Sequence, residues 1–77
     1  MDTPSFAPFL QLLGRRRRQL GLNQQEVANL LGMSRASLSQ LERGMGNPTL
    51  DTLTRLADVL GLELKLSLKQ THQILES

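Results

Sequence analysis

The chain has 77 residues, a formal net charge of +2, no cysteine and a single histidine, His72. The lack of cysteine excludes a disulfide framework and a thiolate zinc site, and with one histidine we expect neither an imidazole metal site nor a catalytic triad. No apolar run approaches the roughly 18 residues of a membrane span, and the apolar stretch 6–13 precedes its arginines, the wrong order for a signal peptide.

The chain is short for a domain that relies on its core alone. Domains below about 80 residues usually depend on a metal, on disulfides or on a second subunit, so we expect a homo-oligomer. The charge is also uneven, because residues 1–43 carry six positive and three negative side chains, whereas residues 44–77 carry three positive and four negative ones. The first half can face a polyanion, although an ordinary solvated surface explains the same charge.

Hydrophobic periodicity predicts a first helix over about residues 6–20. Ser5 is its N-cap, Pro8 falls in the first turn, where backbone N–H groups lack partners in any case, and Gly21 ends it. Gly14 lies inside this helix and indicates a close contact with another helix. The apolar positions at helical spacing are Phe6, Phe9, Leu10, Leu13 and Leu20.

Two short helices follow, separated by a three-residue turn. Asn23 caps the first, which ends at Gly32, and Ser34 caps the second, which spans residues 35–43 before Gly44. The small Ala28 lets the second helix cross closely above the first, and Gly32 suits a tight turn, so the pair has the arrangement of a helix-turn-helix. The inward-facing positions are Val27, Ala28, Leu31, Leu38 and Leu41.

A fourth helix follows the loop 45–48, which contains the strongest helix breakers of the chain. Thr49 caps this helix, which runs through Leu60 and stops at Gly61. Its apolar positions are Leu50, Leu53, Leu56, Ala57 and Leu60. The sequence therefore predicts a mainly α-helical domain with four helices.

Residues 62–69 alternate apolar and polar at every position, which favours a β-strand. A lone strand leaves its backbone groups unpaired, so we expect it to pair with the same strand of a second subunit around a two-fold axis. The alternative is an extended tail packed on the helices. With this strand included, the domain spans residues 1–69 and a tail follows at 70–77. The leucines expected to pair across the dimer are Leu62, Leu64, Leu66 and Leu68.

Residues 24–44, with the preceding segment 17–23, resemble the phage-repressor-like (Xre family) helix-turn-helix domains. The Leu-Glu-Arg-Gly sequence at 41–44 and the Asn-Pro-Thr-Leu-Asp-Thr-Leu sequence at 47–53 add to the likeness, which covers about residues 9–60. The alternating leucines after the fourth helix further resemble HipB-like antitoxins, the DNA-binding partners of HipA-type kinase toxins. The resemblance implies a four-helix lambda-repressor-like fold, closed by a C-terminal strand across a homodimer.

The resemblance also implies that the third helix enters the DNA major groove with its N-terminus first. Arg35 can then bind guanine in a bidentate manner, Gln40 can bind adenine, and Ala36 can contact a thymine methyl group. A solvated helix face is the alternative for Arg35 and Gln40. The base-contacting residues by this matching are Arg35, Ala36, Ser39 and Gln40.

Phosphate contacts are implied at the two ends of this motif. The N-terminus of the second helix favours a phosphate beside Gln24 through its free N–H groups and its dipole. Asn23 and Ser34 act as plain caps in the alternative interpretation, and the two roles are compatible. The phosphate-contacting residues by this matching are Asn23, Gln24, Ser34 and Arg43.

The run of arginines 15–18 points around more than one helical turn, so its members cannot share one task. Arg17 falls on the apolar stripe, where an unpaired guanidinium is very costly. In the family the matching position pairs with the acid near the end of the third helix, here Glu42, so we expect a structural ion pair. The other three arginines are expected to be surface charge.

We expect a DNA-binding repressor of a palindromic operator that acts in the bacterial cytoplasm, with no enzymatic activity, cofactor or metal. The HipB-like resemblance adds an antitoxin role with a HipA-like kinase toxin as partner, and the tail 70–77 either lacks order or becomes ordered on such a partner. Two alternatives stay open: a free-standing repressor without a toxin, and a helical interaction module that does not bind DNA.

Overall fold

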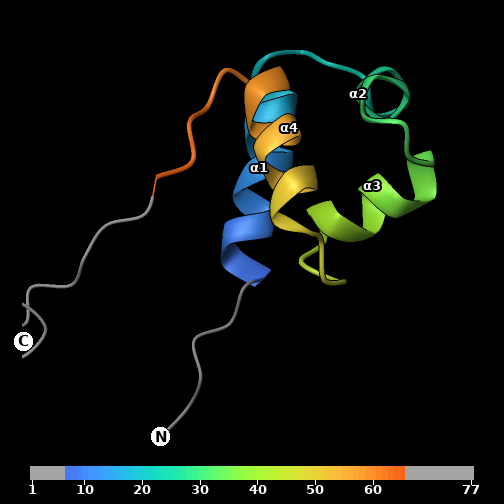
Figure 1. Ribbon diagram of the computed structural model, residues 1–77. Helices are drawn as coiled ribbons and strands as arrows, with labels where there is room; N and C mark the ends of the chain where they lie inside the picture. Colours follow the sequence, from blue (N-terminus) through green and yellow to red (C-terminus); the bar gives the residue numbers. More distant parts are fainter. Residues whose placement is uncertain (1–6, 66–77) are drawn as a thin grey trace, which may run out of the picture.

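The computed structural model describes residues 7–65, and this part of the chain contains four helices (Figure 1). In order they are α1 (Ala7–Gln19), α2 (Gln24–Leu31), α3 (Arg35–Glu42) and α4 (Leu50–Val59). The four predicted helices are confirmed, each with ends within one residue or so of the sequence estimate. The predicted cap Ser5 and the first predicted apolar position, Phe6, lie outside the described residues.

Side-chain caps start three of the four helices as the sequence predicts. Asn23 Oδ1 accepts hydrogen bonds from the backbone N–H groups of Gln25 (2.6 Å) and Glu26 (3.4 Å). Glu26 Oε1 in turn accepts from the Asn23 N–H, which completes a capping box. The hydroxyls of Ser34 and Thr49 cap α3 and α4 by accepting from the N–H groups three residues further on, at 3.0 and 3.1 Å.

The turn between α2 and α3 depends on Gly32. This residue has φ of 69°, in the left-handed region that favours glycine, and ends α2. Met33 N–H then donates to the carbonyl oxygen of Ala28 at 3.0 Å. Figure 1 shows the result, in which α2 and α3 lie together on one side of the molecule. The predicted helix-turn-helix geometry is present.

The core consists of leucines from all four helices around Val27 and Ala28. Its members are Leu10, Leu13, Val27, Ala28, Leu31, Leu38, Leu53, Leu56 and Leu60. Two apolar positions of the predicted helical pattern are not part of the core, because Leu20 is 43% exposed and Leu50 is 69% exposed. Leu20 lies in the turn after the last residue of α1, and Leu50 is the first residue of α4, so neither side chain follows the buried stripe of its helix.

The segment after α4 is only partly described. Residues 62–65 form no strand, and the side chains of Leu62 and Leu64 pack against the core while remaining half-buried. The rest of the predicted strand, residues 66–69, lies outside the described residues, so pairing across a dimer stays a prediction. Within residues 7–65 no helix is long and apolar enough to cross a membrane.

The packing of α1 against the end of α3 can be tested at Gly44. Gly44 and Gly21 both have a positive φ, 85° and 72°, so alanine is strained at either position by about 1 kcal/mol. A Cβ at Gly44 would lie 2.7 Å from the Cβ of Ala7, whereas a Cβ at Gly21 would meet nothing within 4 Å. We expect Gly44→Ala to lower the free energy of unfolding clearly more than the matched Gly21→Ala, as measured by urea denaturation. Equal losses would contradict the close approach of Ala7 to this turn.

Candidate nucleic-acid interface

The face of α3 that points away from the core is polar and carries an exposed arginine. Leu38 and Leu41 are buried, while Arg35, Ala36 and Gln40 are exposed. Ser39, also predicted to contact a base, is half-buried on the same face. Because positions three and four apart share a helix face, the four predicted base-contacting residues form one continuous surface on α3.

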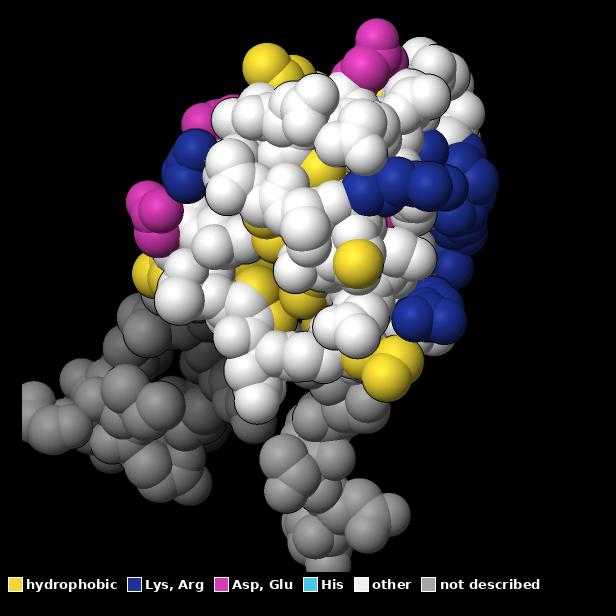
Figure 2. Space-filling model, turned by 90° about the vertical axis from the view of Figure 1, so that its right-hand side faces the viewer, with side chains coloured by type: hydrophobic (Ala, Val, Ile, Leu, Met, Phe, Trp, Pro, Cys, Tyr) yellow, Lys and Arg dark blue, Asp and Glu magenta, His cyan; other side chains and the backbone are white. Residues whose placement is uncertain are grey.

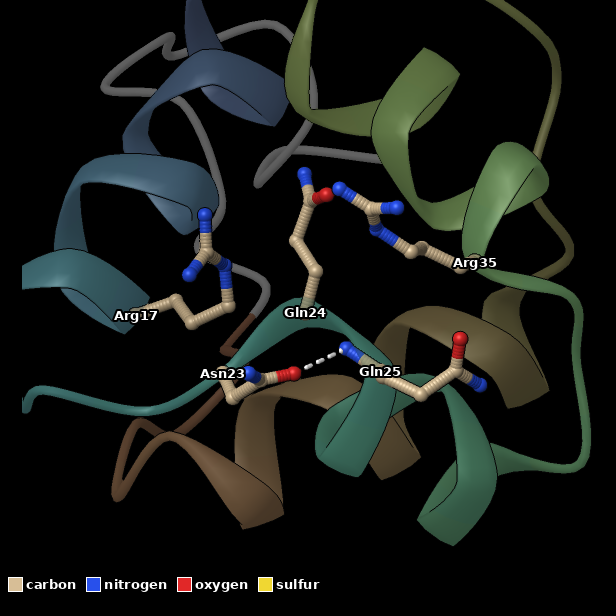
Figure 3. A pocket seen from close by; sticks show the side chains of 5 residues that line it. All are labelled: Arg17, Asn23, Gln24, Gln25 and Arg35. Carbon is tan, nitrogen blue, oxygen red and sulfur yellow. Dashed lines mark hydrogen bonds between the residues drawn. The ribbon is translucent and has the colours of Figure 1, made fainter.

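The N-terminus of α2 lies beside this surface. An open hollow is lined by Arg17, Asn23, Gln24, Gln25 and Arg35 (Figure 3). A second hollow joins Gln24 and Gln25 to Arg35, Ala36 and Ser39 of α3. Two predicted phosphate ligands, Asn23 and Gln24, thus lie next to the predicted base-contacting residues. The positive dipole end of α2 favours an anion here, while the N–H groups of Gln25 and Glu26 are already used by the Asn23 cap.

Gln25 lines both hollows, and the sequence analysis missed it. Its side-chain amide donates to Asn29 Oδ1 at 2.9 Å, so it lies along the exposed side of α2. Its position in the sequence could have indicated this role, because Gln25 directly follows Gln24 in the first turn of a helix whose N-terminus is expected to face phosphate. Its amide adds a further polar group at this edge of α3.

The other predicted residues lie on other parts of α3. Gln40 lines a separate hollow with the 45–49 loop, on the flank of α3 away from Gln24. Ser34 uses its hydroxyl as the cap of α3 and donates to the hydroxyl of Ser37 at 2.9 Å. Arg43 is exposed and is the C-cap residue of α3. The predicted phosphate ligands are therefore distributed over both ends of the helix.

A buried ion pair joins α1 to the end of α3, next to the candidate interface. Arg17 Nε and Nη2 donate to the two carboxylate oxygens of Glu42 at 2.6 and 2.9 Å, and Nη1 donates to the Leu22 carbonyl oxygen at 2.7 Å. The side chains are only 11% and 6% exposed. Gly14 permits the contact, because a Cβ there would lie 3.0 Å from the Cβ of Glu42. The structure thus brings together the two residues that the family resemblance pairs.

The same carboxylate also orients Gln24. Gln24 Nε2 donates to Glu42 Oε1 at 2.9 Å, so the amide nitrogen is turned inward. Figure 3 shows the amide oxygen of Gln24 directed towards the guanidinium group of Arg35. Gln24 thus contacts the buried pair and lines the same hollow as the exposed arginine of α3.

This environment changes the acidity of Glu42. Burial by itself raises the pKa of Glu42, but the hydrogen bonds from Arg17 and Gln24, with the positive charges of Arg17 and Arg18, outweigh it and hold the pKa below its ordinary value. The hydrogen bonds that Arg17 donates to Glu42 raise the pKa of Arg17 in turn. The pair is charged at neutral pH.

Comparisons with known proteins agree with this architecture. The family described as Helix-turn-helix matches residues 13–66. The SPbeta prophage-derived uncharacterized HTH-type transcriptional regulator YonR of Bacillus subtilis is 38% identical over 64 residues, which are 83% of this chain and 59% of that protein. The ImmF control region 10 kDa protein of Bacillus phage phi105 is 41% identical over 66 residues, which are 84% of this chain and 72% of that protein.

A solved structure is similar over nearly the whole chain. A chain of the HipA-HipB-O2-O3 complex matches with a TM-score of 0.72 and 26% identity, over 91% of this chain and 99% of that one. The coverage of curated relatives is smaller, since the chain spans about three fifths of the length of the Bacillus subtilis regulator.

The buried pair predicts a specific loss of stability in acid. Because the folded-state pKa of Glu42 is lowered, the folded protein binds fewer protons than the unfolded chain in the acid range. The contribution of Glu42 is complete above the pKa of an ordinary glutamate, about 4.3, and is lost as the pH falls through the lower folded-state value. Glu42→Gln should remove this part of the acid dependence and lower the free energy of unfolding at pH 7 by about 3 kcal/mol.

Urea denaturation between pH 3 and pH 7 measures both effects. Asp51→Asn is the matched control, because Asp51 is exposed and its ion pair with Arg55 is long, at 3.8 Å. A Glu42→Gln variant with the same free energy of unfolding as the natural protein at pH 7 would exclude a structural role of the pair.

Proposed function

The chain belongs to the helix-turn-helix family, in its phage-repressor-like (Xre) group, and from this premise we propose that it binds operator DNA sequence-specifically and represses transcription. The observation that carries the proposal is the exposed face of α3. There Arg35 and Gln24 line the same hollow, and the N-terminus of α2 lies beside it. Proteins of this architecture place such a helix in the major groove.

Base recognition is proposed for the α3 residues. Arg35 lies at the N-terminal end of α3, and an arginine there can donate two hydrogen bonds to the O6 and N7 atoms of a guanine. Gln40 can bind the N6 and N7 atoms of an adenine, and Ala36 can contact a thymine methyl group. Ser39 is short, so it permits close approach to the base edges.

Phosphate contacts would position the domain without reading the sequence. The positive dipole end of α2 would hold a phosphate on one side of α3, with the Gln24 backbone N–H as a donor, because the Gln24 side-chain nitrogen already donates to Glu42. Ser34 and Arg43 would bind the backbone at the two ends of α3. The Asn23 side-chain oxygen is used as a cap, so the Asn23 amide nitrogen is the group that remains for phosphate.

We propose further that the protein acts as a homodimer on a palindromic operator. Two α3 helices would then enter successive major grooves, with half-sites about one helical turn of DNA apart or one turn more. Residues 62–69 would supply the intermolecular strand, and an occupied operator would block the polymerase. In this proposal the protein works in the bacterial cytoplasm and catalyses no reaction.

The second candidate is an antitoxin that also represses its own operon. It is favoured by the similarity to a chain of the HipA-HipB-O2-O3 complex, which covers almost the full length of both chains. The partner would then be a HipA-like kinase toxin encoded by a neighbouring gene. A neighbouring gene without kinase motifs would favour the free-standing repressor. If this protein does not bind DNA at any salt concentration, the remaining hypothesis is a helical interaction module.

The assignment of α3 is tested with two arginines. Arg35→Ala should weaken binding to the natural site about tenfold or more while raising relative binding to altered sites, because one bidentate base contact is worth about 1–3 kcal/mol. Arg43→Ala should weaken binding to all sequences alike and reduce the salt slope by about one per protomer. Fluorescence anisotropy with duplexes from the region upstream of the gene measures both.

Arg55→Ala is the matched control, because Arg55 is an exposed arginine of α4 outside the proposed interface. If Arg35→Ala and Arg43→Ala bind like this control, α3 is not the recognition helix.

The alternation of apolar and polar residues in the proposed strand provides a matched pair of test variants. Leu66→Lys places a charge among the leucines of the pairing face and should shift the protein towards monomer and weaken operator binding. Ser67→Lys adds the same charge on the opposite face of the strand and should leave the dimer intact. Sedimentation velocity at low micromolar concentration distinguishes the two, and a Leu66→Lys variant that stays dimeric would rule out the intermolecular strand.

A further inference from the structure

The four consecutive arginines of α1 differ in what their side chains contact. Arg17 is held in the buried ion pair. Arg16 is also engaged, because its Nε donates to the carbonyl oxygen of Leu60 at the end of α4, at 3.0 Å. This contact corrects the expectation that Arg16 is only surface charge. Arg15 and Arg18 are exposed, and within residues 7–65 neither side chain takes part in a hydrogen bond or ion pair.

The two free arginines lie on the flank of α1 that faces α3. Gln11, Gly14, Arg15 and Arg18 follow the three- and four-residue spacing of one helix face. Gly14 touches Glu42 near the end of α3, and Gln11 Nε2 donates to the Arg43 carbonyl oxygen at 3.4 Å. Arg18 is close enough to Glu42 for its charge to lower the pKa of that carboxyl group.

No acidic residue of α1 neutralises this flank, and the nearby Glu42 is already paired with Arg17. No aspartate or glutamate occurs between positions 3 and 25, so no carboxylate lies one helical turn from Arg15 or Arg18. Figure 2 shows Lys and Arg side chains gathered along one edge of the face that it draws, with most acidic side chains elsewhere on that face. Adjacent like charges repel, and a polyanion would relieve this repulsion.

We propose that Arg15 and Arg18 form a second phosphate-binding row, contributed by α1, which holds the DNA backbone beside the groove that α3 enters. The inference rests on the proposed function and deepens it. Packed helices lie about 8–10 Å apart, and the major groove is about 12 Å wide. A helix packed against the flank of α3 therefore meets the backbone that borders the groove. Arg15 and Arg18 are one turn apart, about 5–6 Å, so they reach neighbouring phosphates of one strand.

This row adds affinity without specificity. Phosphate contacts carry no base information, and each neutralised phosphate releases counterions, which steepens the fall of affinity with salt. Arg16 belongs to α4 packing and Arg17 to the ion pair, so only two of the four charges contribute. The arrangement assigns separate tasks to Arg35, which contacts bases, and to the α1 row, which holds the backbone.

The test is a charge-matched pair of variants measured on the full chain. Arg15→Gln/Arg18→Gln removes the row, and Arg55→Gln/Lys65→Gln removes two exposed positive charges elsewhere. Binding to the duplex upstream of the gene and to a scrambled duplex is measured by anisotropy from 50 to 400 mM KCl. We expect the first variant to reduce the slope of log K against log salt by about two per bound protomer on both duplexes. The control should leave the slope unchanged.

Ethylation interference locates the individual phosphates that the row contacts. The natural protein should show two interfering phosphates per half-site that the Arg15→Gln/Arg18→Gln variant lacks. If the Arg15→Gln/Arg18→Gln variant shows the same salt slope and footprint as the natural protein, and the natural protein binds the operator normally, the row is overturned and the proposed function stands. That result is expected if the partner of this flank is an acidic protein. Loss on the upstream duplex only would also overturn it, because that outcome indicates base reading. A natural protein without salt-dependent DNA binding would overturn both proposals.

Discussion

The buried ion pair between Arg17 and Glu42 is the interaction on which the rest of the structure depends. A guanidinium on the apolar stripe of α1 is tolerated only because each of its three nitrogens finds an acceptor, two on the carboxylate and one on the Leu22 carbonyl group. These three contacts join the end of α1, the loop before α2 and the end of α3. Gly14 is part of the same arrangement, since a side chain there would push Glu42 away.

The pair also links stability to the candidate recognition surface. Glu42 accepts a third hydrogen bond, from Gln24, and this bond decides which way the Gln24 amide faces. With its nitrogen turned inward, its oxygen faces Arg35 (Figure 3). A change at Glu42 therefore affects both the packing of the core and the orientation of Gln24, which lines the same hollow as Arg35.

The sequence predicted local features well and long-range contacts less well. The caps Asn23, Ser34 and Thr49 were predictable because the signal and its hydrogen bond lie within three residues. The exposed positions Leu20 and Leu50 were not, because periodicity does not reveal where a helix begins or ends. Arg16 contacts Leu60 across 44 positions, and no local pattern shows such a contact. Arg17 was placed next to Glu42 by the cost of an unpaired charge on an apolar stripe together with the family resemblance.

The arginine run shows why net charge alone is a poor guide to function. Successive residues of a helix are rotated by about 100°, so four identical side chains meet three environments: the α3 flank for Arg15 and Arg18, the end of α4 for Arg16, and the core for Arg17. Two of the four charges are consumed by the fold. The charge left for a polyanion lies next to α3 and not around the whole domain. If the chain binds DNA as proposed, each copy offers few phosphate contacts, and the proposed two-fold repetition would double that number.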